Sequence, residues 1–283
     1  MTLSPWKGEW VVSLLMIGAM LSRAGFVSSY GADQGGWFMG EKSTEQHRND
    51  IYGDLNAEKG AAPPIPAATV VLLRDAVSGP EVLMLRKTSK IHFGGMWVFP
   101  GGRIDGEDYP QDRDLETAAR TAAAREAHEE AGIQTLPDDF VWFAHWQPPK
   151  STPKRFSTWF FAAEASEHAV EIDGGEIDDH SWITPAKALD SHRAGEIDLA
   201  PPTWVTLYHL SRYSPTAAVL EQFRSRKPKF YHTHVGVRDD GVRVCMWTGD
   251  AGYEQSDADA SGERHRLVMA KEGFDFVNSI ESY

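Results

Sequence analysis

Three glutamates, Glu126, Glu129 and Glu130, stand in the segment REAHEEAGI (residues 125–133), downstream of the glycine pair in FPGG (residues 99–102). If residues 118–131 are helical, the spacings i, i+3 and i+4 bring the three carboxylates to one face. Like charges so close together destabilise a helix and raise one another's pKa. The pattern therefore predicts a divalent cation among the carboxylates, and oxygen-only ligation favours Mg²⁺ or Mn²⁺.

Composition restricts the class of partner. The chain has 283 residues, of which 41% are apolar, enough for a substantial core, and its formal charge is −13. A net negative charge opposes non-specific attraction to nucleic-acid phosphates, so we expect a small-molecule substrate and no nucleic acid. Cys245 is the only cysteine, which excludes an internal disulfide and a thiolate metal cluster, and we expect it to be a small buried hydrophobe.

Residues 1–62 are predicted to be a flexible N-terminal extension. The apolar run at residues 10–21 follows Lys7 but has only 12 residues, too few to span a bilayer comfortably. The alternatives are an over-long start with Met39 as the true one, a signal peptide, or a membrane anchor. We expect a cytoplasmic location without membrane association, with export as the alternative; the sequence does not predict the oligomeric state.

The apolar runs predict an α/β fold, a mixed β-sheet with helices on its faces. An Ala-rich helix over 118–131, capped by Asp112 or Asp114 and ended by Gly132, would pack on the sheet. After Gly195 the pattern changes to two helices and further strands, so we predict a core domain over 63–195 and a helical plus β C-terminal extension over 196–283. The predicted strands and helices of the core and extension are, in order, strands 69–74, 81–86, 96–99, 140–146, 157–163 and 181–183, a helix from Pro185, helices 203–213 and 215–226, and strands 230–237, 242–247 and 266–269.

The combination of FPGG and REAHEEAGI resembles the signature of the Nudix hydrolases. The resemblance implies the Nudix fold and hydrolysis of a nucleoside diphosphate linked to another group, with Mg²⁺ or Mn²⁺. It also implies that Glu126, Glu129 and Glu130 are metal ligands, with Glu129 and Glu130 catalytic, and that the carbonyl of Gly101 adds a further ligand. A metal at this site would neutralise phosphoryl oxygens and activate water.

The upstream half of the signature departs from the family pattern. Arg125 lies 23 positions after Gly102, which amounts to an insertion of nine residues relative to the family. Thr117 takes the place of the first glutamate, with Glu116 beside it and Glu107 in the inserted loop. We expect Arg125 to hold this loop or to pair with Glu129 and not to bind substrate.

A general base is also needed, and Glu176 in GGEIDDHSW is the leading candidate. It stands six residues before Trp182, where related Nudix sequences place a metal-binding or water-activating glutamate. Asp178 and Asp179 are alternatives, as is a solvated acidic loop without a catalytic role.

Cations must meet the substrate phosphates. Arg86, Lys90, Arg103 and Arg155 flank the expected cleft, and arginine is suited to bidentate phosphate contacts. We predict Arg86, Arg103 and Arg155 as substrate-binding residues; solvated surface cations are the alternative for each.

Softer motifs outside the signature resemble the acyl-coenzyme A diphosphatase-like branch of the family. They are RFSTWFF (155–161), DLAPPTWVTLYHLSRY (198–213) and GDAGY (249–253). This resemblance implies a coenzyme A or acyl-CoA diphosphatase. A nucleotide-sugar, dinucleotide or NADH pyrophosphatase and a non-catalytic nucleotide-binding module are the alternatives.

Overall fold

The computed structural model describes residues 46–55, 63–89, 93–152, 154–165 and 169–280. They all belong to one compact unit, Met39–Tyr283. The apolar run at 10–21, the alternative start at Met39 and the candidate cation Lys90 lie outside the described residues. Within them, no helix is long and apolar enough to cross a membrane.

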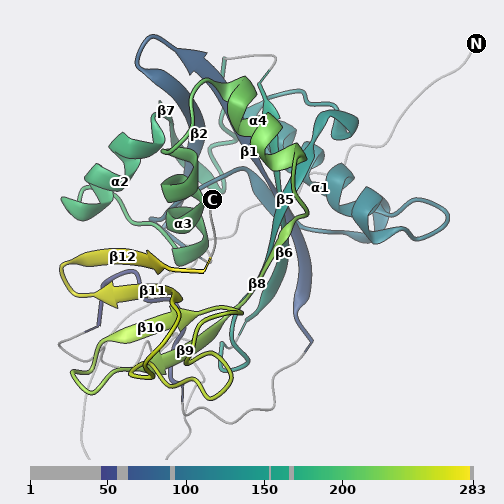
Figure 1. Cartoon of the computed structure of the whole chain (residues 1–283). Helices are drawn as coiled ribbons and strands as arrows, with labels where there is room; N and C mark the ends of the chain where they lie inside the picture. The colour runs from purple at the N-terminus through teal and green to yellow at the C-terminus, as the bar shows by residue number, and fades with distance from the viewer. Residues whose placement is uncertain (1–45, 56–62, 90–92, 153, 166–168, 281–283) are drawn as a thin grey trace, which may run out of the picture. The chain divides into compact units, whose positions relative to one another are not determined.

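A mixed eight-stranded sheet forms the centre of the part that the structure describes (Figure 1). Its strand order is β3-β2-β1-β6-β5-β8, with β4 paired to β1 and β7 paired to β2. The pairs β1–β6 and β5–β8 are parallel, and the others are antiparallel. The strands of this sheet are β1 (Ile65–Ala76), β2 (Gly79–Lys87), β3 (Trp97–Val98), β4 (Gly101–Arg103), β5 (Val141–Gln147), β6 (Phe156–Glu164), β7 (Ile177–Ile183) and β8 (Lys229–His232).

Helices cover both faces of the sheet, as predicted. In Figure 1 α1 lies to the right of the strands, and α2 and α3 lie to the left. Alternation along β1 explains the two layers, since Val70 and Leu72 pack in the core beneath α1, whereas Val71 and Leu73 pack in the second core with α2, α3 and α4. The helices and short 3₁₀ turns are η1 (Gly106–Asp108), α1 (Leu115–Ala131), η2 (Pro137–Asp139), α2 (Pro185–Arg193), α3 (Pro201–Leu210) and α4 (Thr216–Arg224).

Helix α1 has the start and end that its sequence encodes. Asp114 is the N-cap, and its carboxylate accepts a hydrogen bond from the Thr117 amide at 2.8 Å. Gly132 ends the helix in the left-handed conformation, φ 69°. The fully buried alanines of α1 let the helix approach β1 closely, which places its glutamates at the edge of the sheet.

The C-terminal extension contributes to two sheets. Strand β8 extends the large sheet, while β9 (His234–Val237), β10 (Arg243–Met246), β11 (His265–Ala270) and β12 (Gly273–Asn278) form a second, four-stranded sheet. The single strand-like run predicted over 230–237 is therefore two strands that separate at Thr233, and β12 was not predicted. Cys245 is fully buried, as expected for a small hydrophobe.

One predicted loop is partly a strand, and one strand, β4, was not predicted. Strand β7 begins at Ile177, so much of the predicted acidic loop 176–179 is paired with β2. Gly101–Arg103 forms β4 against β1, because glycines accept the extended backbone while their missing side chains allow close contacts. The boundary drawn at residue 195 stays a prediction.

Candidate active site

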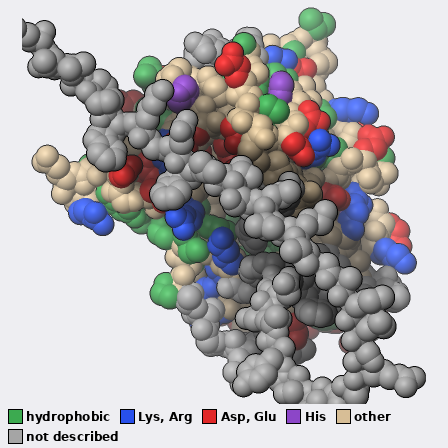
Figure 2. Space-filling view, turned by 180° about the vertical axis from the view of Figure 1, so that it is seen from behind, with side chains coloured by type: hydrophobic (Ala, Val, Ile, Leu, Met, Phe, Trp, Pro, Cys, Tyr) green, Lys and Arg blue, Asp and Glu red, His purple; other side chains and the backbone are tan. Residues whose placement is uncertain are grey.

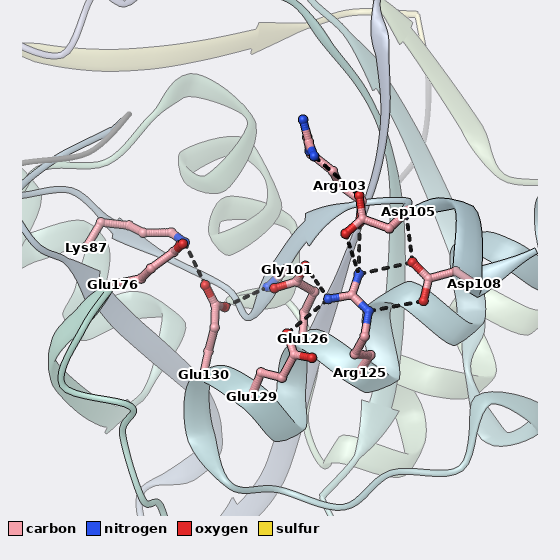
Figure 3. A network of polar contacts seen from close by, with 10 residues as sticks. All are labelled: Lys87, Gly101, Arg103, Asp105, Asp108, Arg125, Glu126, Glu129, Glu130 and Glu176. Carbon is pink, nitrogen blue, oxygen red and sulfur yellow. Dashed lines mark hydrogen bonds and ion pairs between the residues drawn. The ribbon is translucent and has the colours of Figure 1, made fainter. Parts of the chain in front are cut away.

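The three glutamates of α1 lie near Gly101 (Figure 3), and Gly102 lies against the carboxylate of Glu126. Glu126 and Glu130 are turned toward the protein, and the Glu130 side chain is only 5% exposed. Glu129 is 56% exposed and lies toward solvent. The helical spacing therefore places the three glutamates on one side of α1, as the sequence predicts, and their exposure increases from Glu130 through Glu126 to Glu129.

Both glycines lie too close to their neighbours for a Cβ atom, and at Gly101 the neighbour is backbone, which cannot move aside. A Cβ on Gly102 would collide with the carboxylate of Glu126, and one on Gly101 would collide with the backbone of β1 at Ala68 and Thr69. The Gly101 amide donates a hydrogen bond to Glu130 Oε2 at 3.0 Å. The contact that the structure describes is made by the amide of Gly101, and a role for its carbonyl stays a prediction.

Arg125 is the centre of the network. Its guanidinium donates hydrogen bonds to Asp108 at 3.0 and 3.1 Å, to Glu126 at 2.9 Å and to Glu129 at 3.0 Å. It also donates to the carbonyl of Arg103 at 3.1 Å, which fixes the inserted loop to α1. The hydrogen bond that Arg125 donates to Asp108 is the largest influence on the pKa of Arg125, which is raised above its ordinary value, so the guanidinium stays charged. Arg125 thus both holds the loop and pairs with Glu129.

Asp108 is the residue that sequence reasoning missed. It lies in the nine-residue insertion, is buried, and also accepts a hydrogen bond from the Asp105 amide at 2.8 Å. Glu116, the glutamate nearest to the expected position, pairs instead with Arg120 at 2.7 Å on its own helix. Only the fold of the insertion brings Asp108 to Arg125, because the two residues are 17 positions apart.

Lys87, at the end of β2, was also missed. Its Nζ lies 2.6 Å from Glu130 Oε1 and 3.3 Å from Glu176 Oε2. Burial lowers the pKa of Lys87, but its contacts with Glu130 and Glu176 outweigh burial, and the pKa is raised. This lysine links the α1 glutamates to the candidate general base, and the only sequence signal was a cation beside Arg86 at the end of an apolar strand.

Arg125 and Lys87 compensate the negative charge of the acids only in part, as the pKa values of the glutamates show. Burial, with the neighbouring charges of Glu130 and Glu129, raises the pKa of Glu126 to about 7, although Arg125 opposes the shift. Burial also raises the pKa of Glu130, although Lys87 and the Gly101 amide oppose it. Crowded carboxylates with raised pKa values are the electrostatic environment that a divalent cation would relieve.

The donor set fits a hard cation, but its present arrangement is one of ion pairs. Among the described residues, no three His, Cys, Asp or Glu side chains converge on a point that could hold a metal ion. The reason is that Arg125 holds Glu126 and Glu129, while Lys87 holds Glu130. Carboxylate oxygens remain the ligands that Mg²⁺ and Mn²⁺ prefer, and small rotations of these side chains would be needed to share one ion.

The predicted phosphate-binding cations lie at different places. Arg86 pairs with Asp178 at 2.6 Å across β2 and β7. Arg103 pairs weakly with Asp105 at 3.4 Å, and Figure 3 shows its guanidinium pointing away from the α1 glutamates. Arg155 is 8% exposed, precedes β6, and its charge contributes to the lowered pKa of His232. Arg103 is in the network through its carbonyl, and the substrate contacts of all three arginines stay predictions.

Comparison with known proteins gives the family. A family model for the NUDIX domain matches residues 63–201. The acyl-coenzyme A diphosphatase NUDT19 of Xenopus laevis is 22% identical, over 68% of this chain and 76% of that protein. A crystal structure of a NUDIX hydrolase from Alicyclobacillus acidocaldarius is 21% identical, covers 56% of this chain and 96% of its own, and superimposes with a TM-score of 0.50. The NUDIX domain of Shewanella oneidensis NrtR, complexed with ADP ribose, is 21% identical over 56% of this chain and 92% of its own, with a TM-score of 0.41.

The domain match covers strands β1 to β7 of the large sheet, α1 and the glycine pair that carry the site. Nudix hydrolases act on phosphorus-containing anhydrides and generally use a divalent metal such as Mg²⁺. Together, the REAHEEAGI helix, the fold and the matched domain identify this chain as a member of the Nudix hydrolase family.

Proposed function

We propose that the chain is a Mg²⁺- or Mn²⁺-dependent pyrophosphohydrolase whose preferred substrate is coenzyme A or acyl-CoA. The cleaved bond is a P–O–P linkage of a nucleoside diphosphate joined to another group. Membership of the family supports the reaction class. The likeness to an acyl-coenzyme A diphosphatase, which extends over 68% of this chain, supports the choice of substrate.

The observation that carries the proposal is the crowding of Glu126, Glu129 and Glu130 beside Gly101 and Gly102. We assign the metal ligands to these three glutamates and to the carbonyl of Gly101. A bound divalent ion would neutralise charge on the phosphoryl oxygens and lower the pKa of a water molecule. Arg125 and Lys87 hold the carboxylates near that position, so the protein keeps the acids together at a tolerable electrostatic cost.

For the general base, the geometry favours Glu176 over its neighbours. Glu176 lies 3.3 Å from the Lys87 ammonium that also binds Glu130, and its own side chain is 64% exposed. Asp178 and Asp179 instead pair with Arg86, at 2.6 and 3.8 Å. We therefore assign proton abstraction from the attacking water to Glu176, with Glu129 and Glu130 as the other catalytic carboxylates.

The substrate phosphates need cations near this site. Arg86 and Arg103 lie on β2 and β4, the strands that carry Lys87 and the glycine pair. Arg155 lies in the segment that leads into β6, two strands from β4 across β1. We assign phosphate contacts to these three arginines, with Arg103 supplying the solvent-facing contact because its side chain is the most exposed of the three, at 60%.

A substrate panel tests the proposal. Purified protein is incubated with coenzyme A, ADP-ribose, NADH or diadenosine polyphosphate, with Mg²⁺, with Mn²⁺ or with a chelator, and the products are separated by chromatography. We expect metal-dependent release of a 4′-phosphopantetheine product from coenzyme A at the highest kcat/KM. A higher kcat/KM for one of the other compounds would replace the substrate assignment, and tight binding without turnover of any compound would replace the reaction by a binding role.

A further inference from the structure

A second candidate site lies on the other side of the central sheet from α1. A cavity of about 660 Å³ opens between β5, β8, α3 and the segment after α4. Trp146 and Tyr231 belong to the core that α2, α3 and α4 cover, whereas the alanines of α1 belong to the opposite core. The cavity is therefore separated from the carboxylates of α1 by the sheet itself.

The lining of this cavity is basic in a strongly acidic chain. Arg226, Lys227 and Lys229 line it together with His209 and His265, and none of its described lining residues is an Asp or Glu. The chain as a whole has 41 acidic and 28 basic residues. On the molecular face in Figure 2, red and blue side chains are interspersed. A lining whose charged side chains are all basic favours the binding of an anionic ligand.

The walls of the cavity are aromatic and closely packed. Trp146 stacks on Tyr231 with ring centroids 3.8 Å apart, and Phe143 stacks on Phe223 at 4.3 Å. His209 and Tyr231 are buried, and their side chains approach to 3.4 Å. Rings held in fixed positions offer flat apolar surface to a planar ligand at little cost in conformational entropy.

The positive charges in the cavity affect one another, and the pKa of Lys229 shows this. Burial, followed by the charge of Arg226, lowers the pKa of Lys229 to about 7. Lys229 and Arg226 also contribute to the lowered pKa of buried His209. The cations repel one another in a partly desolvated space, so a bound anion would stabilise them.

We propose that this cavity binds a phosphate ester that carries an aromatic base, of the size of a nucleoside monophosphate, without hydrolysing it. The phosphate would contact Arg226 and Lys229, and the base would lie against the aromatic wall. The volume is within the range of small-molecule sites. This site goes beyond the proposed reaction, because such a ligand contains no P–O–P bond and the cavity contains no carboxylate.

The probe is AMP, titrated into the full chain by calorimetry in the presence of a chelator, so that metal-dependent binding at the α1 glutamates is suppressed. We expect one AMP per chain, and we expect the double variant Arg226→Gln/Lys229→Gln to weaken binding at least about tenfold. The control is Lys187→Gln/Arg193→Gln on α2, which changes the net charge equally at exposed positions. It should bind AMP like the original protein.

Two further measurements make the result decisive. Glu126→Gln/Glu130→Gln should leave AMP binding unchanged, and ribose 5-phosphate, which lacks the base, should bind at least about tenfold more weakly than AMP. The proposal is overturned by absence of AMP binding, by equal binding in the Arg226/Lys229 variant, by loss of binding in the Glu126/Glu130 variant, or by equal affinity for ribose 5-phosphate. Thermal melting of each variant establishes that it is folded.

Discussion

Charged residues are used in opposite ways in two regions of this molecule. At the α1 site five acids, Asp108, Glu126, Glu129, Glu130 and Glu176, share two cations, Arg125 and Lys87. In the small sheet and the segment that packs on it, two buried acids each have their own arginine: Asp250 with Arg266 at 2.5 Å, and Asp50 with Arg243 at 2.9 Å.

The comparison distinguishes ion pairs that stabilise the fold from carboxylates that are arranged to bind a ligand. Matched pairs in a buried environment leave little net charge, and hydrogen bonds from the His265 and Gly252 amides complete the shell of Asp250. The α1 site instead keeps an excess of negative charge, and burial together with the neighbouring carboxylates raises the pKa of Glu126 and of Glu130 although cations are adjacent. Such an electrostatic cost to the folded state is typical of functional sites, where a bound ligand compensates the charge.

The largest expected effect is on turnover. Glu130→Gln removes a proposed metal ligand and should lower kcat by about a thousandfold, since a metal supplies several kcal/mol of transition-state stabilisation. Steady-state hydrolysis of coenzyme A with Mg²⁺ measures the change. Glu116→Gln, on the same helix but paired with Arg120, is the matched control and should retain activity within about threefold. Similar losses in both variants would show that the site's acids have no special role.

The next largest effect is expected on stability, when a buried ion pair loses one partner. Arg266→Met leaves the buried carboxylate of Asp250 uncompensated and should lower the free energy of unfolding by about 3–5 kcal/mol. Urea unfolding followed by circular dichroism measures it. Arg238→Met, whose partner Asp240 is half-exposed, should cost less than about 1 kcal/mol. Equal costs would contradict the distinction between buried and exposed pairs.

A smaller effect is expected at Asp108. Asp108→Asn keeps the shape of the side chain but removes the charge that pairs with Arg125, and it should lower the free energy of unfolding by about 1–3 kcal/mol. The same urea experiment applies, with Glu107→Gln in the same short turn as control. If Glu107→Gln were the more destabilising, Asp108 would not be the partner that holds the inserted loop.

The smallest effect concerns pH. Burial lowers the pKa of His265 to about 4, from an ordinary value of 6.5. The unfolded chain then binds a proton at a pH where the folded chain does not, so this stability is complete above pH 6.5 and is lost as the pH falls toward 4. His265→Gln should therefore reduce the loss of stability between pH 7 and pH 6 by about 1 kcal/mol. An unchanged pH dependence would mean that His265 titrates normally in the folded protein.

Local sequence signals predicted much of the fold. Strands 69–74 and 81–86 and the helix that ends at Gly132 follow from apolar periodicity and capping, and the helical spacing of Glu126, Glu129 and Glu130 predicted their common face. Residues brought in by tertiary structure were not predictable in this way. Asp108 reaches Arg125 only through the fold of an insertion. Lys87 reaches Glu130 and Glu176 only because β2 pairs with β7 and ends beside α1.

Strand assignments failed where the local pattern is weak. Gly101–Arg103 reads as a loop because glycine has low strand propensity, yet pairing with β1 fixes it as β4. Gly273–Asn278 was not predicted as a strand, because its apolar alternation is short, and pairing with β11 fixes it as β12. Partition of 230–237 between two sheets depends on long-range pairing that no local pattern contains.

Metal binding by the α1 carboxylates is the central claim, and Mn²⁺ titration monitored by electron paramagnetic resonance tests it most directly. The signal of free Mn²⁺ is recorded as protein is added, for the original chain, for Glu126→Gln/Glu130→Gln and for Glu116→Gln as control. We predict that the original chain and the control bind Mn²⁺ equally and that the double variant binds it at least about tenfold more weakly. Unchanged Mn²⁺ affinity in the double variant would contradict the account.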